Sequence, residues 1–222
     1  MAKYIVQGGK KLKGSVKVSG SKNAALPILC ATLLADESVT LKNVPDIADI
    51  HAMISIINTI GAKATFEKNT IEIDPRGLKS KYVSNEGKHC MRASILLLGP
   101  LLAKFNKAKM AYPGGCILGK RPVDTHLFAL EALGAEVMED PNDIEVKTKG
   151  LKGADLVMSE LSVTATENVI MAAVLAEGTS VIRLAAAEPH VQDLCHFLNK
   201  LGAKITGIGT HELTIKGVKS LK

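Results

Sequence analysis

Tryptophan is absent from this sequence, and aromatic residues as a whole make up only 3% of its 222 residues. Proteins that hold single-stranded nucleic acid stack its bases on aromatic side chains, so the composition argues against such a partner. The net charge is +6, but the lysines are spread along the chain rather than gathered in one basic block. We therefore expect no nucleic-acid partner, and a basic cleft for small phosphorylated substrates suits the charge equally well.

The sequence also lacks paired cysteines and long apolar runs. Its four cysteines are Cys30, Cys90, Cys116 and Cys195, and their spacing is typical neither of a metal site nor of a disulfide framework. No charge-free apolar run reaches about 20 residues, and no cleavable apolar leader is present. We expect a reduced, soluble, cytoplasmic protein with no metal site and no membrane partner.

What the sequence does contain is one unit repeated three times. A Leu-Gly-Ala or Ile-Gly-Ala triplet recurs about every 70 residues, ending at Ala62, Ala135 and Ala203. Each unit predicts an apolar helix, a short strand, an amphipathic helix and a two-stranded ribbon. The apolar helices are expected at Ala24–Ala35, Arg92–Ala103 and Ala165–Ala176, and the amphipathic helices at Asp46–Ile60, Asp124–Leu133 and Pro189–Leu201.

A helix that is apolar all round must be buried, so the three apolar helices are expected to pack together at the centre. The predicted fold class is α/β (α+β), an inside-out, barrel-like domain of three pseudo-symmetric repeats with buried helices and outer sheets. This domain spans residues 20–222. Residues 1–19 form a separate N-terminal segment, in which strands are expected at Tyr4–Gln7 and Ser15–Val18.

Unusual polar residues stand at the beginnings of the three buried helices. Lys22 and Asn23 open the first helix, Arg92 the second and Ser162 the third. Pseudo-symmetry places these helix N-termini at one end of the domain, where their free N–H groups can bind an anion. Helix capping would explain the serine and the asparagine, but it does not require the charges of Lys22 and Arg92. We predict an anion-binding site at this end.

A glycine-rich loop runs from Pro113 to Asp124 and carries Cys116, with Lys120 and Arg121 close behind it. Glycines let the backbone move, and nearby cations favour the reactive thiolate. The equivalent connections in the other two units are shorter, and long loops in compact domains are often functional. One interpretation is a mobile active-site loop acting on an anionic substrate, and the other is a small buried cysteine.

Other polar residues give weaker signals. His126 and His190 show no metal-like spacing, and Asp49 is expected simply at a helix start. No glycine fingerprint of the Rossmann or P-loop type is present.

Three motifs together resemble the UDP-N-acetylglucosamine 1-carboxyvinyltransferase family, the cytoplasmic enolpyruvyl transferases of bacterial peptidoglycan (cell-wall) synthesis. They are Ser21-Lys22-Asn23-Ala24-Ala25-Leu26-Pro27, Met91-Arg92-Ala93-Ser94, and Pro113-Gly114-Gly115-Cys116 followed by Gly119-Lys120-Arg121-Pro122-Val123-Asp124. The resemblance runs over essentially the whole chain. It implies transfer of the enolpyruvyl group of phosphoenolpyruvate to the 3′-hydroxyl of UDP-N-acetylglucosamine, with release of phosphate and with no metal or organic cofactor.

The resemblance also implies roles by matching position. Lys22 and Arg121 would hold the phosphate of phosphoenolpyruvate, and Asn23 would contact the sugar. Cys116 would be the loop cysteine that acts as a general acid, can add covalently to phosphoenolpyruvate and is the target of fosfomycin. The residues expected to bind the UDP-sugar are Arg92, Arg121, Pro122, Val123, Asp124, Thr125, Ser162 and Val163.

This sequence departs from the family pattern in two ways. Where the family has Ser-Val-Gly-Ala-Thr, this chain has Ser162-Val163-Thr164-Ala165-Thr166, so Thr164 replaces a glycine. Glu160, two residues before this stretch, adds a negative charge near the expected diphosphate site. The chain also has about half the length of the family enzyme, which has two similar three-unit domains with the active site between them. Residues 1–19 would belong to the second domain, whose catalytic aspartate and arginine this chain lacks.

Several readings therefore stay open. The chain is expected to be the N-terminal half of the transferase, able to bind the UDP-sugar but nearly inactive without the second domain or a second copy. The related shikimate-pathway enolpyruvyl transferase is an alternative, although that relative lacks the loop cysteine. A non-catalytic UDP-sugar-binding or interaction domain is the third reading, with Glu160 and Thr164 as signs of relaxed function.

Overall fold

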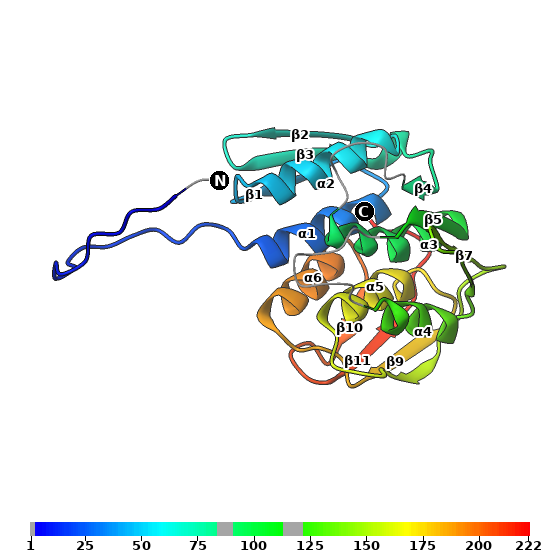
Figure 1. Ribbon diagram of the computed structural model, residues 1–222. Coiled ribbons are helices and arrows are strands. Elements are labelled where there is room, and N and C mark those ends of the chain that lie inside the picture. The colour runs from blue at the N-terminus through cyan, green and yellow to red at the C-terminus, as the bar shows by residue number, and fades with distance from the viewer. Residues whose placement is uncertain (1–2, 84–90, 113–121) are drawn as a thin grey trace.

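The computed structural model describes residues 3–83, 91–112 and 122–222, which form three similar units (Figure 1). The first contains α1 (Lys22–Ala31), η1 (Thr32–Leu34), β1 (Val39–Lys42), α2 (Ala48–Thr59), β2 (Lys63–Glu67) and β3 (Thr70–Asp74), followed by η2 (Pro75–Gly77) and β4 (Tyr82–Val83). The second contains η3 (Arg92–Leu97), α3 (Leu98–Phe105), β5 (Lys107–Ala111), α4 (Asp124–Ala132), β6 (Glu136–Glu139) and β7 (Asp143–Lys147), followed by β8 (Asp155–Val157). The third contains α5 (Val163–Ala173), β9 (Thr179–Arg183), α6 (Pro189–Lys200), β10 (Lys204–Thr206) and β11 (Glu212–Lys216).

The three sheets repeat one strand order. In each unit the last strand lies in the middle and pairs antiparallel with the other two, as in β1-β3-β2. The strand that follows each of the first two units then joins the sheet of the next unit in parallel, β4 beside β5 and β8 beside β9. The predicted arrangement of three pseudo-symmetric repeats is confirmed.

The third unit is linked to the first in a similar way. Leu221 forms a parallel bridge with Ala35, and the backbone N–H of Asp36 donates to the carbonyl oxygen of Leu221 at 2.9 Å. The bridge between Lys152 and Glu177 is its counterpart between the second and third units. The three units therefore close into a ring, held at this point by residues from nearly opposite ends of the chain.

The helices lie inside this ring and the sheets outside it. Figure 1 shows α1, α3 and α5 in the middle, with the sheet of the first unit on one side and that of the third on the other. α3 packs against α5, and every residue from Ala165 to Ala173 of α5 is buried. This is the inside-out arrangement that the apolar helices predict. Among the described residues, no helix is long and apolar enough to cross a membrane.

Glycine ends the amphipathic helices as the sequence predicts. Gly61, Gly134 and Gly202 have φ angles of 104°, 89° and 100°, so each stands just after its helix in a left-handed conformation that suits glycine.

The apolar helix of the second unit is not continuous, and the prediction of one helix over Arg92–Ala103 was wrong in this respect. A 3-10 segment, η3, comes first, and α3 begins only at Leu98. At the junction the side chain of Asn168 inserts between Ile95 and Gly99. Its Nδ2 donates to the Ile95 carbonyl at 2.8 Å, and its Oδ1 accepts from the Gly99 N–H at 2.9 Å. The amide thus replaces one backbone hydrogen bond of an α-helix.

The predicted strands at Tyr4–Gln7 and Ser15–Val18 are also absent. Residues 3–20 run as an extended segment away from the body (Figure 1). Tyr4 and Ile5 are 93% and 97% exposed, and Val16 is 88% exposed. A strand needs a neighbour for its backbone hydrogen bonds, and the described residues offer none here.

Candidate active site

A cleft of about 980 Å³ opens where the three central helices begin. Its walls come from the starts of α1, η3 and α5 and from the first turns of α2, α4 and α6 with the residues just before them. Its polar or charged lining residues are Lys22, Asn23, Asp49, Arg92, Thr125, His126, Glu160, Ser162, Thr164, Glu167, Glu188 and His190. Pseudo-symmetry has therefore brought the three helix starts together, as the sequence predicts.

Two cations stand at these helix starts. Lys22 is the first residue of α1, whose N-cap Ser21 accepts from the Ala24 N–H, and its Nζ lies 2.8 Å from Oδ2 of Asp49 on α2. Arg92 begins η3, and its Nη2 donates to the carbonyl oxygen of Pro122 at 3.1 Å. The Lys22 side chain is 49% exposed, so an anion can reach its ammonium group from the cleft.

Another wall of the cleft joins the first turn of α4 to the turn before α5. Thr125 Oγ1 donates to Glu160 Oε1 at 3.0 Å and accepts from Ser159 Oγ at 3.3 Å. Ser162 caps α5 through its backbone, and its carbonyl oxygen accepts from Thr166 Oγ1 at 2.8 Å. This wall offers hydroxyl groups and the free N–H groups of a helix start, with one carboxylate beside them.

A buried polar network supports the cleft from below. His126 is 2% exposed, and its Nδ1 lies 2.9 Å from Asn168 Nδ2 while its Nε2 lies 3.1 Å from Thr164 Oγ1. Because Asn168 Oδ1 already accepts from Gly99, its Nδ2 must donate to Nδ1, so Nε2 carries the imidazole proton. Burial, followed by the nearby Arg92 charge, lowers the pKa of His126 to about 4. His126 is therefore neutral at pH 7 and holds Thr164 in place.

Glu167 lies one turn into α5, on the floor of the cleft, and is 1% exposed. Burial, followed by the charge of Glu188, raises the pKa of Glu167 to about 8. Its Oε1 has no hydrogen-bond partner among the described residues. The carboxyl is therefore neutral at pH 7, and one of its oxygens accepts no hydrogen bond within the described ranges.

The structure unites most of the predicted site residues and leaves two of them untested. Those that line the cleft are Lys22, Asn23, Arg92, Pro122, Thr125, Ser162 and Val163. Val123 is buried beside the cleft and Asp124 is exposed at the start of α4, so neither belongs to the lining. Cys116 and Arg121 lie outside the described residues. Within the described ranges no group of three or more His, Cys, Asp or Glu residues could hold a metal ion.

Sequence reasoning missed several residues that line the cleft. Asp49, His126, Glu188 and His190 all lie at or before the starts of the amphipathic helices. The signal was available, because pseudo-symmetry that unites one set of helix starts also unites the next set. Glu167 could have been noticed as a carboxylate inside an otherwise apolar helix.

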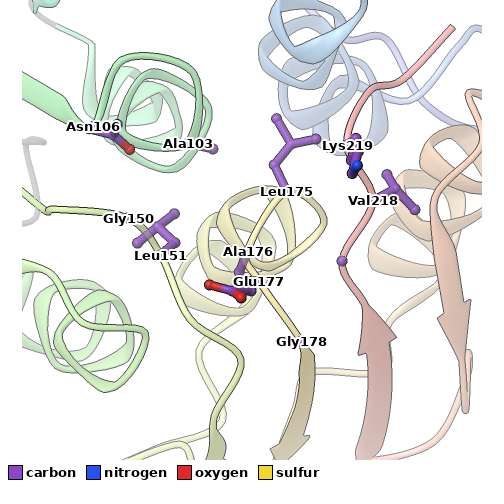
Figure 2. Close-up of a pocket in the computed structure, with 11 residues that line it drawn as sticks. Ala103, Asn106, Gly150, Leu151, Leu175, Ala176, Glu177, Gly178, Val218 and Lys219 are labelled. Carbon is purple, nitrogen blue, oxygen red and sulfur yellow. The ribbon is translucent and has the colours of Figure 1, made fainter.

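A second, smaller cavity of about 490 Å³ lies at the opposite ends of the central helices. Figure 2 shows Asn106 after α3, Glu177 after α5 and Lys219 near the end of the chain around it. Its other lining residues are small or apolar, and no predicted site residue is among them. The cleft at the helix starts is therefore the candidate active site.

Curated relatives are about 50% identical to this chain over its whole length. The chain is 50% identical over 221 residues to UDP-N-acetylglucosamine 1-carboxyvinyltransferase of Borreliella burgdorferi. The match covers 100% of this chain and 52% of that protein. It is 49% identical over 222 residues to the enzyme of the same name from Dichelobacter nodosus, covering 53% of it. The chain thus spans about half the length of the curated relatives it matches.

In solved structures with the same fold, this chain likewise matches about half of the solved chain. The enolpyruvyl transferase NikO from Streptomyces tendae superposes with a TM-score of 0.82 at 21% identity, over 96% of this chain and 51% of that one. EPSP synthase from Acinetobacter baumannii gives a TM-score of 0.75 at 20% identity, over 96% of this chain and 49% of that one. At these identities the likeness concerns the fold alone. The sequence pattern of the EPSP synthase (3-phosphoshikimate 1-carboxyvinyltransferase) family matches residues 6–222, and the chain belongs to that family.

Proposed function

We propose that this chain supplies the UDP-sugar-binding half of an enolpyruvyl transferase. The whole reaction would move the enolpyruvyl group of phosphoenolpyruvate to UDP-N-acetylglucosamine, with release of phosphate, in the cytoplasmic phase of peptidoglycan synthesis. The observation that carries this proposal is the convergence of Lys22, Arg92 and Ser162 from three separate units on one cleft. Relatives at about half identity bear the name of this transferase.

The cleft suits an anionic substrate pair. Fixed cations and helix N-termini stabilise phosphate groups before and during their departure, because they need no reorganisation at that moment. Lys22 would hold the phosphate of phosphoenolpyruvate, sharing its charge with Asp49 until the substrate arrives. Asn23 would contact the sugar, and Arg92 with Ser162 and Val163 would bind the UDP portion. The reaction needs no cofactor for these steps.

The glycine-rich loop would bring the remaining chemistry. The enol ether must be protonated at its methylene carbon, which calls for a general acid. By its resemblance to the family motif, Cys116 would be this acid and the target of fosfomycin, and Arg121 would join Lys22 at the phosphate. A second domain, or another copy of the chain, would be needed to close the cleft over the substrates.

The test measures binding and turnover separately. Calorimetry should show that the chain binds UDP-N-acetylglucosamine and not shikimate 3-phosphate. Phosphate release from phosphoenolpyruvate, measured over a range of protein concentrations with Cys116→Ala as control, should be slight or absent for the chain alone. Binding of shikimate 3-phosphate in preference to the UDP-sugar would contradict the proposal and favour the shikimate-pathway reaction.

The acidic side of the cleft favours a second candidate. Glu160 places a carboxylate beside Thr125 and Ser162, where a diphosphate would bind. A non-catalytic UDP-sugar-binding or interaction domain would tolerate this charge more easily than an enzyme would. Failure of fosfomycin to alkylate Cys116, together with retained binding of the UDP-sugar, would favour this candidate.

A further inference from the structure

Glu167 is a buried residue that lines the cleft and has a carboxyl oxygen without a hydrogen-bond partner among the described residues. Within the described ranges, two buried side-chain oxygens have no hydrogen-bond partner, Glu167 Oε1 and Ser180 Oγ, and only Glu167 lines the cleft. A buried polar atom without a partner costs free energy, so native structures rarely keep one without a use. The oxygen without a partner therefore points to a group that the described residues do not supply.

The surroundings decide which kind of partner fits. Glu188, just before α6, faces Glu167, as do Cys30 of α1 and Cys195 of α6. None of these groups is a cation. Burial, followed by the charge of Glu188, raises the pKa of Glu167 and leaves it protonated at pH 7. A neutral carboxyl both donates and accepts a hydrogen bond. It suits a hydroxyl or an amide, whereas a phosphate is better served by Lys22 and Arg92.

We propose that Glu167 is a substrate-binding residue that hydrogen-bonds an uncharged hydroxyl or amide group of the sugar at the floor of the cleft. This inference rests on the proposed function, since it takes the UDP-sugar as the ligand. The cleft then separates its tasks, with the phosphates at the charged helix starts and the sugar one helical turn deeper on α5.

The experiment compares UDP-N-acetylglucosamine with UDP, which lacks the sugar. Binding of both is measured by calorimetry for the unsubstituted chain, Glu167→Gln and Glu167→Leu. Glu177→Gln is the matched control, because Glu177 follows the other end of α5 and lines the second cavity. Circular dichroism verifies that each variant is folded.

Glu167→Leu should weaken binding of UDP-N-acetylglucosamine about fivefold, the worth of one neutral hydrogen bond. Glu167→Gln keeps a donor and an acceptor, so its affinity at pH 6.5 should stay within about twofold of the unsubstituted chain. Raising the pH from 6.5 to 8.5 should weaken sugar-nucleotide binding by the unsubstituted chain and not by Glu167→Gln, because only the carboxyl can ionise. UDP binding should be the same in all four proteins.

Equal affinity of the Gln variant and the unsubstituted chain at both pH values would overturn the inference, even if the Leu variant failed to fold. An equal loss for UDP and for UDP-N-acetylglucosamine would also overturn it, because the sugar would not be involved. No binding of UDP-N-acetylglucosamine by the unsubstituted chain would instead overturn the proposed function, and the inference with it.

Discussion

At the scale of single residues, the charges of the cleft differ in their exposure to water. The Lys22–Asp49 pair is about half exposed, whereas Glu167 is buried. Water screens an exposed ion pair, so the attraction between Lys22 and Asp49 contributes little to stability. The charge of Lys22 stays available to a ligand. A buried carboxyl has the opposite character, because its ionisation is coupled directly to folding.

This coupling gives a pH-dependent prediction for Glu167→Gln. In the folded chain the pKa of Glu167 is raised from its ordinary value of 4.5 to about 8. Below pH 4.5 the carboxyl is neutral in both the folded and the unfolded chain, so it does not oppose folding. As the pH rises towards 8, the unfolded chain ionises first, and the folded state loses stability relative to it. Relative to the unsubstituted chain, the free energy of unfolding of Glu167→Gln should rise by about 4 kcal/mol between pH 4.5 and 8.5. Urea unfolding at several pH values measures this, and a constant difference would contradict it.

The exposed pair should behave differently. Asp49→Asn should change the free energy of unfolding by less than about 1 kcal/mol and strengthen the binding of inorganic phosphate roughly threefold, because Lys22 no longer shares its charge. Lys22→Ala should weaken phosphate binding instead. Phosphate titrations at low and high salt would test both changes. Weaker phosphate binding by Asp49→Asn would show that the carboxylate is needed to orient Lys22.

At the scale of elements, the break between η3 and α3 depends on a residue from another unit. Asn168→Ala would leave the Ile95 carbonyl and the Gly99 N–H without partners in the core and would also remove the donor to His126. We expect a loss of about 3 kcal/mol in the free energy of unfolding.

Asn199 provides a matched control for this prediction. Its side-chain amide also makes two backbone hydrogen bonds, both to Ile205, but at the partly exposed start of β10. Water can replace these bonds, so Asn199→Ala should cost only about 1 kcal/mol. Denaturant unfolding of both variants makes the comparison, and equal losses would mean that burial does not decide the outcome.

The same elements show how far the sequence could predict the structure. The helix ends at Gly61, Gly134 and Gly202 were predictable because the signal is local. The break at Gly99 was not, since it depends on an amide that lies far away in sequence. The expected strand at Tyr4–Gln7 had the right residues, but strand formation needs a neighbour that no local pattern reveals.

The residues of the candidate site also differ in how far the sequence could predict them. Lys22, Arg92 and Ser162 could be predicted because the repeat alone implies that their helix starts converge. Glu167 could have been noticed as a carboxylate in an apolar helix, but its role could not be predicted. That role depends on its burial and on an oxygen without a partner among the described residues. The predicted roles of Cys116 and Arg121 remain predictions, because both lie outside the described residues.

At the scale of the whole molecule, stability depends on closing the ring of three units. Leu221 is completely buried and lies beside Ala35, which places it at the joint between the third unit and the first. Leu221→Ala should lower the free energy of unfolding by about 3 kcal/mol, as usual for a buried leucine. Leu12→Ala, in the exposed N-terminal segment, is the control and should have almost no effect. Similar midpoints for the two variants would show that the joint does not hold the domain together.

The joint between Ala35 and Leu221 also affects how the protein folds while the ribosome synthesises it. Synthesis is vectorial, so the first unit emerges before its partner at this joint, which lies in the third unit and far along the chain. Contacts between residues so far apart form late and slow the search for the native state. The nascent first unit must therefore wait, with apolar surface uncovered, and this interval is when chaperones would be of most use to the chain.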